Sequence, residues 1–246
     1  MKNIRIALEI YEGNVEDLPP GYQQVSCHII FDVKMRENLR CNDQIVAGGN
    51  NTTAPSSTNY SSVVSRYSVR IPLTVHALNN LRVLMCNIRN AYLTTKCREK
   101  IWTLAGLEIG TEQGKFMFVV RELYGMNSSG ASFRSLIAKQ LHDLGYRQSI
   151  SEPDFWMRPA VIPGGFMYYE YVICYVDDVI CFSDDLLHAT RVIQYKLKPK
   201  GDKKEEAAMY LSAKFSKMNN INGQDFWAIY YDKYWTTAVT NVESIL

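Results

Sequence analysis

The chain has 246 residues, of which 47% are hydrophobic and 21% are charged, a balance typical of a globular protein with a sizeable core. The formal net charge of +2 excludes a strongly basic or acidic surface overall, so any nucleic-acid surface would have to be a local patch. No apolar stretch approaches the roughly 18 residues of a membrane span, and the first residues, MKNIRIALEIYEGNVEDL, lack the apolar core of a signal peptide.

The cysteines indicate the redox setting. Six are present, none in a CxxC pair, and Cys174 and Cys181 lie inside an apolar run where Cys acts as a small hydrophobic residue. This usage favours reduced thiols in an intracellular protein over a disulfide framework.

The first half of the chain alternates strand and helix signals. Residues 22–33 are rich in β-formers and predict a strand, followed by a hairpin connection over 34–43 and a returning strand over 44–48. Gly, Asn, Thr and Ser over 48–62 indicate an exposed loop. Residues 66–79 have helical apolar spacing, although Pro72 would fall in the interior, where proline costs about 3 kcal/mol. Residues 81–88 predict a short buried strand.

The second half predicts further strands around one clear helix. Segments 101–109 and 115–123 are strand-like and are separated by a turn signal at 112–114. An amphipathic helix begins at Ser128 or Ser129 and ends at Gly145. Residues 167–176 and 179–183 predict a tight hairpin, followed by a polar helix over 184–197 and a strand over 210–215. This mixed order favours an α+β fold over a doubly wound parallel sheet.

Two adjacent carboxylates, Asp177 and Asp178, lie in the otherwise apolar and aromatic stretch ICYVDDVICF (173–182). Burying ionised carboxylates without partners is costly, so a compensating group is expected. At a hairpin tip both can approach one cation, and hard divalent ions such as Mg²⁺ prefer carboxylate oxygens. The alternative is turn chemistry alone, because Asp tolerates turn geometry and bonds its own backbone.

Six segments resemble, in order, the reverse transcriptase region of the Pol polyprotein of copia-type long-terminal-repeat retrotransposons. They are QIVAGG (44–49), YSSVVSRYSVRI (60–71), VLMCNIRNAYL (83–93), LYGMNSSGASFR (123–134), YVDD (175–178) and YLSAKF (210–215). Each segment is short, but their order and spacing over nearly the whole chain make the resemblance specific.

The resemblance implies a right-hand-like polymerase fold with fingers, an antiparallel palm sheet and a truncated thumb. The whole chain, 1–246, would be a single reverse-transcriptase domain. Roughly 1–62 and 95–128 would form the fingers, 63–94 and 129–217 the palm, and 218–246 the start of the thumb or connection. The implied chemistry is attack of a primer 3′-hydroxyl on the α-phosphate of a deoxynucleotide, with Mg²⁺, or Mn²⁺, as cofactor.

The same resemblance assigns roles to individual residues. The catalytic positions would be Asp177, Asp178 and Asn87, the last in place of the family's first catalytic Asp. Metal ligands would be the two aspartates and the backbone carbonyl of Ile88. Tyr92 would exclude a ribose 2′-hydroxyl from the nucleotide pocket. That pocket would also include Tyr124, Gly125, Asn42 and Gln44, and the primer grip would include Tyr210, Leu211 and Ser212.

Several residues depart from the family pattern, and Asn87 matters most. An amide oxygen can coordinate a metal but brings no negative charge. Losing one electrostatic element of this kind costs on the order of 100-fold or more in rate. Asn42 and Gln44 also replace basic residues of the fingers, Asn127 replaces a Lys, and Ser212 replaces a Gly. The departures predict that nucleotidyl transfer is impaired or absent.

The leading hypothesis is therefore an RNA-directed DNA polymerase domain of copia-type ancestry with degenerate catalysis. Its partners would be an RNA or DNA template with a DNA primer and deoxynucleoside triphosphates, without a membrane. Its location would be the cytoplasm, with virus-like particles in intact family members. The alternatives are a non-catalytic remnant that still binds nucleic acid through phosphate contacts, or a decayed product with no biochemical role.

Overall fold

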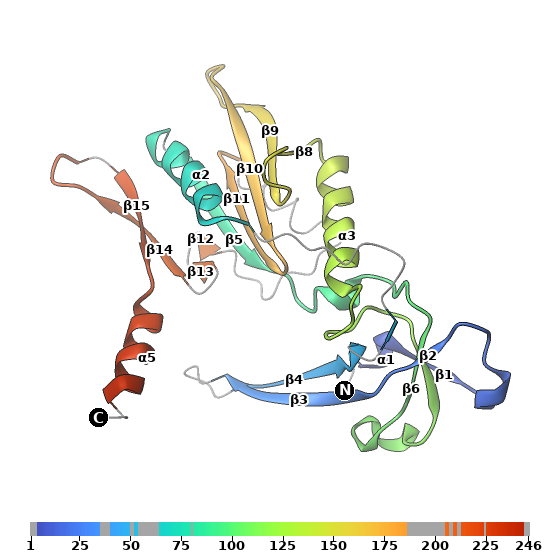
Figure 1. The fold of residues 1–246 in the computed structure, drawn as a ribbon. Helices are drawn as coiled ribbons and strands as arrows, with labels where there is room; N and C mark the ends of the chain where they lie inside the picture. Colours follow the sequence, from blue (N-terminus) through green and yellow to red (C-terminus); the bar gives the residue numbers. More distant parts are fainter. Residues whose placement is uncertain are drawn as a thin grey trace. The chain divides into compact units, whose positions relative to one another are not determined.

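The protein is described by a computed structural model that covers residues 4–34, 40–49, 52–53, 64–79, 81–185, 205–206, 209–210, 213–223 and 225–243. The chain divides into two compact units (Figure 1). The first unit consists of Met1–Ser61 and Asn90–Ile137, and the second of Ser62–Arg89 and Ala138–Leu246. The chain thus crosses from one unit to the other after Ser61, Arg89 and Ile137.

Short strands are the main regular structure described in the first unit. A four-stranded sheet has the order β1-β7-β6-β2, and β3 and β4 form a separate antiparallel hairpin. The strands are β1 (Leu8–Tyr11), β2 (Gln23–Gln24), β3 (Cys27–Lys34), β4 (Arg40–Ala47), β6 (Ile101–Leu104) and β7 (Phe116–Val119). Helical segments are α1 (Ile4–Ala7) and the 3-10 turns Val15–Asp17, Tyr92–Thr94 and Leu107–Glu112. Helix α3 (Ser129–Asp143) begins in this unit.

Two glycines let the segments after β4 and β7 approach closely. The Ala47 amide donates to the Tyr124 carbonyl at 2.8 Å. Gly125 has φ +87°, and a Cβ there would lie 2.1 Å from the Ala47 carbonyl oxygen. A Cβ on Gly49 would lie 2.3 Å from the Gly125 carbonyl oxygen. Only glycine fits at these positions, so the QIVAGG and LYGMN segments are matched to each other.

The second unit is built on a six-stranded antiparallel sheet with the order β12-β5-β11-β10-β9-β8. Its strands are β5 (Arg82–Asn87), β8 (Arg147–Gln148), β9 (Phe155–Val161), β10 (Met167–Tyr175), β11 (Asp178–Ser183) and β12 (Glu205–Glu206). A smaller antiparallel sheet contains β13 (Met209–Tyr210), β14 (Ala213–Asn219) and β15 (Asp225–Tyr230). Helices α2 (Arg66–Leu78) and α5 (Asp232–Glu243) complete the unit.

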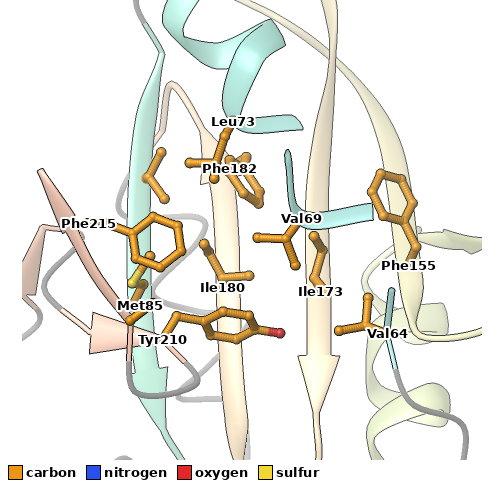
Figure 2. Close-up of a cluster of buried hydrophobic side chains, with 12 residues drawn as sticks. Val64, Val69, Leu73, Met85, Phe155, Ile173, Ile180, Phe182, Tyr210 and Phe215 are labelled. Carbon is orange, nitrogen blue, oxygen red and sulfur yellow. The ribbon is translucent and has the colours of Figure 1, made fainter. Parts of the chain in front are cut away.

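One face of the six-stranded sheet carries the main hydrophobic core of this unit (Figure 2). Residues directly opposite each other in antiparallel strands share a face, as Ile180 does with Met85 and Ile173. Helix α2 contributes Val69 and Leu73 to the same core. The remaining members are Val64, Val83, Phe155, Phe182, Tyr210, Ala213 and Phe215. The sheet, α2 and the β13–β15 sheet therefore share one core.

Helix α2 continues through Pro72, which sequence analysis treats as a conflict with the helical pattern. Ser65 caps the helix by accepting from the Ser68 amide, and the helix then runs for 13 residues with Pro72 buried inside it. His76, one turn later, is fully buried and bonds the Pro72 carbonyl through Nδ1 at 2.9 Å. Since a carbonyl only accepts, Nδ1 carries a proton in this bond. Tertiary packing therefore outweighs the local penalty of the proline.

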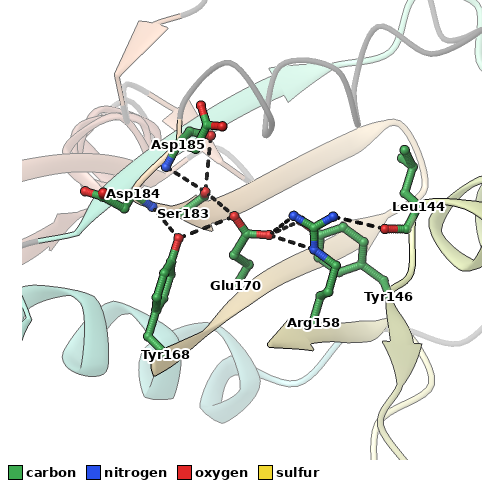
Figure 3. Close-up of polar contacts among 8 residues, drawn as sticks. All are labelled: Leu144, Tyr146, Arg158, Tyr168, Glu170, Ser183, Asp184 and Asp185. Carbon is green, nitrogen blue, oxygen red and sulfur yellow. Dashed lines mark hydrogen bonds and ion pairs between the residues drawn. The ribbon is translucent and has the colours of Figure 1, made fainter. Parts of the chain in front are cut away.

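The opposite face of the sheet buries a charged network around Glu170 (Figure 3). Arg158 donates to Glu170 Oε2 from Nε at 3.0 Å and from Nη2 at 2.6 Å. Tyr146 and Ser183 donate to the same carboxylate at 3.2 and 2.6 Å. Arg158 also lies 5.1 Å from the Tyr146 ring centroid and donates to the Leu144 carbonyl. Several donors thus satisfy a carboxylate that would otherwise be destabilising in the interior.

The predicted fold class, α+β with an antiparallel sheet, is confirmed. The hairpin at 167–183, the strand at 81–88 and the helices predicted at 66–79 and from Ser128 or Ser129 to Gly145 are present, with shifted ends. The hairpin predicted over 22–48 is formed by β3 and β4, whereas residues 23–24 form the separate strand β2, which pairs with β6. Strand β4 begins earlier than predicted, and the predicted strand 101–109 ends early because Leu107–Glu112 forms a 3-10 turn. The predicted helix at 184–197 and most of the predicted loop at 48–62 lie outside the described residues.

Strands β1, β8, β9, β12 and β15 and helices α1 and α5 were not predicted. The single strand predicted over 210–215 is wrong, because β13 and β14 are two strands that pair antiparallel. The predicted division into fingers, palm and thumb stays a prediction. Among the described helices, none has the length and apolar character needed to cross a bilayer.

Burial, with a smaller contribution from Asp178, raises the pKa of the Cys86 thiol to about 12, so the thiol stays protonated and packs as an apolar group.

The buried His76 predicts acid sensitivity of folding. Burial lowers the pKa of His76 from 6.5 to about 4, against the opposing effect of its bond to the Pro72 carbonyl. Between these values the unfolded chain binds a proton that the native chain does not, so stability falls as pH falls through this window. We expect the free energy of unfolding to fall by about 2 kcal/mol between pH 7 and pH 5 from this cause. Urea unfolding of the wild type and of His76→Asn at both pH values measures it, and equal pH dependence in the two chains would contradict it.

Candidate functional site

The candidate site is built on the hairpin that joins β10 to β11. Tyr175 and Asp178 form its last ladder pair, which leaves Val176 and Asp177 as a two-residue loop. Val176 has φ +50°, and such positive values favour Gly, Asn or Asp rather than a β-branched residue. Positive φ at the first loop residue alone is the pattern of a type II′ turn, which matches strand twist. The hairpin therefore holds strained backbone immediately before the two carboxylates.

Strand β5 brings Asn87 to the same end of the sheet. Asp178 is the direct cross-strand partner of Asn87, so their side chains share a face. The amide of Ile88 donates to the Asp177 carbonyl at 2.7 Å and ties the chain after β5 to the hairpin loop. The structure thus brings together the three predicted catalytic positions, although Asn87 lies about 90 residues before the two adjacent aspartates in the sequence.

The Asn87 amide lies between the two carboxylates and bonds both. Nδ2 donates to Asp177 Oδ2 at 3.0 Å and to Asp178 Oδ1 at 2.7 Å. All three side chains are half-buried. Asn87 Oδ1 is itself buried and has no hydrogen-bond partner among the residues that the structure describes. The amide therefore presents its donor group, not its oxygen, to the carboxylates.

This arrangement does not fit a hard divalent cation as it stands. Such a cation needs oxygen ligands pointing toward it, and the inner carboxylate oxygens are instead bonded to an N–H₂ group. Within the described ranges, no group of three or more His, Cys, Asp or Glu residues is placed to hold a metal ion. One compensating group for the aspartates is thus an amide supplied by the chain itself.

The predicted nucleotide-pocket residues lie in the first unit. The rings of Tyr92 and Tyr124 are half-buried, with centroids 4.6 Å apart, and Tyr92 also packs edge-on against Phe133 at 6.0 Å. Gly125 forms the close approach to Ala47, and Gln44 is half-buried on β4. Asn42 is also on β4, but its side chain lies outside the described part. Aromatic packing therefore positions Tyr92 within its own unit.

The predicted primer-grip residues are only partly described. The Tyr210 side chain is 2% exposed and belongs to the core beneath β11 (Figure 2). The Tyr210 ring is therefore not accessible to a primer. Leu211 and Ser212 lie outside the described residues.

The family is decided by comparison with known proteins. A family model described as reverse transcriptase (RNA-dependent DNA polymerase) matches residues 10–228. The chain belongs to this reverse transcriptase family. No curated protein matches the chain.

A solved structure of the foamy viral protease-reverse transcriptase dRH in complex with double-stranded DNA is also similar. The similarity covers 85% of this chain and 31% of that chain, at 10% identity and a TM-score of 0.46. This member of the reverse transcriptase family thus spans about a third of that protein's length. A likeness this distant assigns no residue a role.

Asn127 has a contact that sequence analysis of this reverse transcriptase missed. Its position suggested only the loss of a lysine charge. In the structure its Nδ2 donates to the Gly49 carbonyl at 3.0 Å and to Thr52 Oγ1 at 3.3 Å. The side chain thus links the segment after β4 to the turn after Tyr124. The only available signal was the polar loop that contains Thr52, and nothing local pairs it with residue 127.

The positive φ of Val176 predicts an unusual order of mutant stabilities. In a strand, glycine normally makes a protein less stable than alanine does, by about 0.5–1 kcal/mol. At a residue with left-handed backbone, glycine is instead favoured over alanine by about 1–2 kcal/mol. We expect the free energy of unfolding, measured in urea, to be about 1 kcal/mol higher for Val176→Gly than for Val176→Ala. The matched control is Val161, an exposed residue of β9, where alanine should be the more stable. Alanine equal to or better than glycine at position 176 would contradict the strain.

Proposed function

We propose that this reverse transcriptase family member is an RNA-directed DNA polymerase domain of copia-type ancestry whose nucleotidyl transfer is impaired. The observation that carries the proposal is the pair of bonds from Asn87 Nδ2 to Asp177 and Asp178. The family match supports the polymerase ancestry. The order of six short segments supports the copia-type assignment.

The impairment follows from charge and from hydrogen-bond polarity. Transfer of a nucleotidyl group builds negative charge on the phosphate oxygens, and family members generally balance it with divalent metal ions held by carboxylates. Asn87 contributes no negative charge, and its N–H₂ group faces the position where a cation would need oxygen atoms. Both effects weaken cation binding, so the rate should fall by on the order of 100-fold or more.

The remaining roles extend this proposal. The second unit would act as palm and would present the Asp177–Asp178 hairpin to the primer end. In the first unit, Tyr92 would exclude a ribose 2′-hydroxyl, and Tyr124 and Gly125 would shape the pocket. The substrates would be a template with a DNA primer and deoxynucleoside triphosphates, with Mg²⁺ or Mn²⁺ as cofactor of the intact site, and the location would be cytoplasmic.

Restoring the carboxylate tests the proposal directly. We expect Asn87→Asp to raise primer extension by about 100-fold or more over the wild type in Mg²⁺ or Mn²⁺, because it returns one charge and two acceptor oxygens. Single-nucleotide extension of a labelled primer on RNA and DNA templates measures it. The control is Asn222→Asp, which adds the same charge on an exposed turn and should leave the wild-type rate unchanged. Wild-type extension within threefold of Asn87→Asp would contradict the impairment.

A non-catalytic nucleic-acid-binding remnant is the second candidate. The observation that favours it is that the sheet, the hairpin and the Gly49–Gly125 approach are all retained although the cation site is altered. Under this function, binding of a template–primer duplex would rest on phosphate contacts and would weaken at least 10-fold between 50 and 200 mM salt. Filter binding in EDTA measures this, and absence of binding at 50 mM salt would remove the candidate.

A further inference from the structure

The two carboxylates of the hairpin are joined through an amide of the chain itself. The two protons of Asn87 Nδ2 serve different partners, Asp177 Oδ2 at 3.0 Å and Asp178 Oδ1 at 2.7 Å. An amide N–H₂ has two donors and no acceptor, so this geometry uses its full donor capacity. Two negative groups that would repel each other are thereby held together by one neutral donor.

The backbone fixes this meeting independently of the side chain at position 87. Asp178 pairs with Asn87 across β11 and β5, and the Ile88 amide is bonded to the Asp177 carbonyl at 2.7 Å. The strained φ of Val176 shows that the loop is held by its surroundings and not by its own preference. The backbone of residue 87 is therefore held beside both aspartates, whichever side chain it carries.

The orientation of the amide is set by the carboxylates. Asn87 Oδ1 is buried and lacks a hydrogen-bond partner within the part of the chain that the structure describes, which carries a free-energy penalty. Turning the amide by half a rotation would direct the oxygen lone pairs at two negative groups and leave Nδ2 without its acceptors. Only a cation between the three side chains would reverse that preference.

We propose that the Asn87 amide takes the place of the divalent cation, as an internal neutral donor that holds Asp177 and Asp178 together. The site then forms without a cation, and its affinity for hard divalent cations is low. The inference deepens the proposed function and rests on it in taking Mg²⁺ or Mn²⁺ as the cation that is replaced. Under this inference the folding stability of the wild type does not depend on a divalent cation, which impaired catalysis alone does not require.

Thermal unfolding with and without cation tests the inference. For the wild-type chain, Tm in EDTA and in millimolar Mn²⁺ should agree within about 1 °C. Asn87→Asp places a third carboxylate against the other two, so its Tm in EDTA should lie about 5 °C or more below the wild type. Saturating Mn²⁺ should restore most of that loss, since a ligand that binds only the native state raises Tm. Asn222→Asp, with the same added charge elsewhere, should behave as the wild type.

Asn87→Ala separates the two possible roles of the amide and serves if Asn87→Asp does not fold. If the amide replaces the cation, its removal takes this one donor away from both carboxylates, and Asn87→Ala should bind Mn²⁺ at least as tightly as the wild type. If the amide were instead a ligand through Oδ1, Asn87→Ala would bind more weakly. Loss of the free Mn²⁺ signal in electron paramagnetic resonance measures the affinities.

Three results would overturn the inference. The first is a rise of the wild-type Tm with Mn²⁺ as large as that of Asn87→Asp. The second is a Tm of Asn87→Asp that does not change with Mn²⁺. The third is tighter Mn²⁺ binding by the wild type than by Asn87→Ala. Cation-dependent stability of Asn87→Asp without primer extension would contradict the proposed function and leave this inference standing.

Discussion

The antiparallel register between β11 and β5 is the constraint on which the site depends. It pairs Asp178 with Asn87 and, on the same face, Ile180 with Met85. A shift by one residue would move every side chain of β11 to the other face of the sheet, so the apolar core and the carboxylate site are specified together. Packing of α2 and of Phe215 against that face therefore also secures the position of residue 87 relative to the hairpin.

The two faces of the sheet satisfy buried carboxylates in different ways. Glu170 has a full cation, Arg158, together with hydroxyl donors, and is 2% exposed. Asp177 and Asp178 share a neutral amide and stay half-buried, where water still screens part of their charge. The difference follows the depth of burial, because a deeper carboxylate loses more hydration and requires a stronger partner in the protein.

Local patterns in the sequence predicted the hairpin, helix α3 and the strand that carries Asn87, since each has a clear periodicity or turn signal. The meeting of Asn87 with the aspartates followed only from the family resemblance, because pairing across about 90 residues leaves no local trace. The direction of the amide could not be predicted, since it depends on which atoms are nearest in space. Strand β9 escaped prediction because Arg158 and Pro159 interrupt its alternation, although β10 on one side and β8 on the other hold it in the sheet.

The backbone bonds around residue 87 also bear on how such a site changes over generations. The Ile88–Asp177 bond and the β5–β11 ladder hold the same positions together whichever side chain residue 87 carries. Asparagine and aspartate codons differ by a single base, so one base change removes or restores the carboxylate. A lineage with this architecture can keep its fold while it loses the catalytic carboxylate, and the reverse mutation needs no more base changes than the loss did.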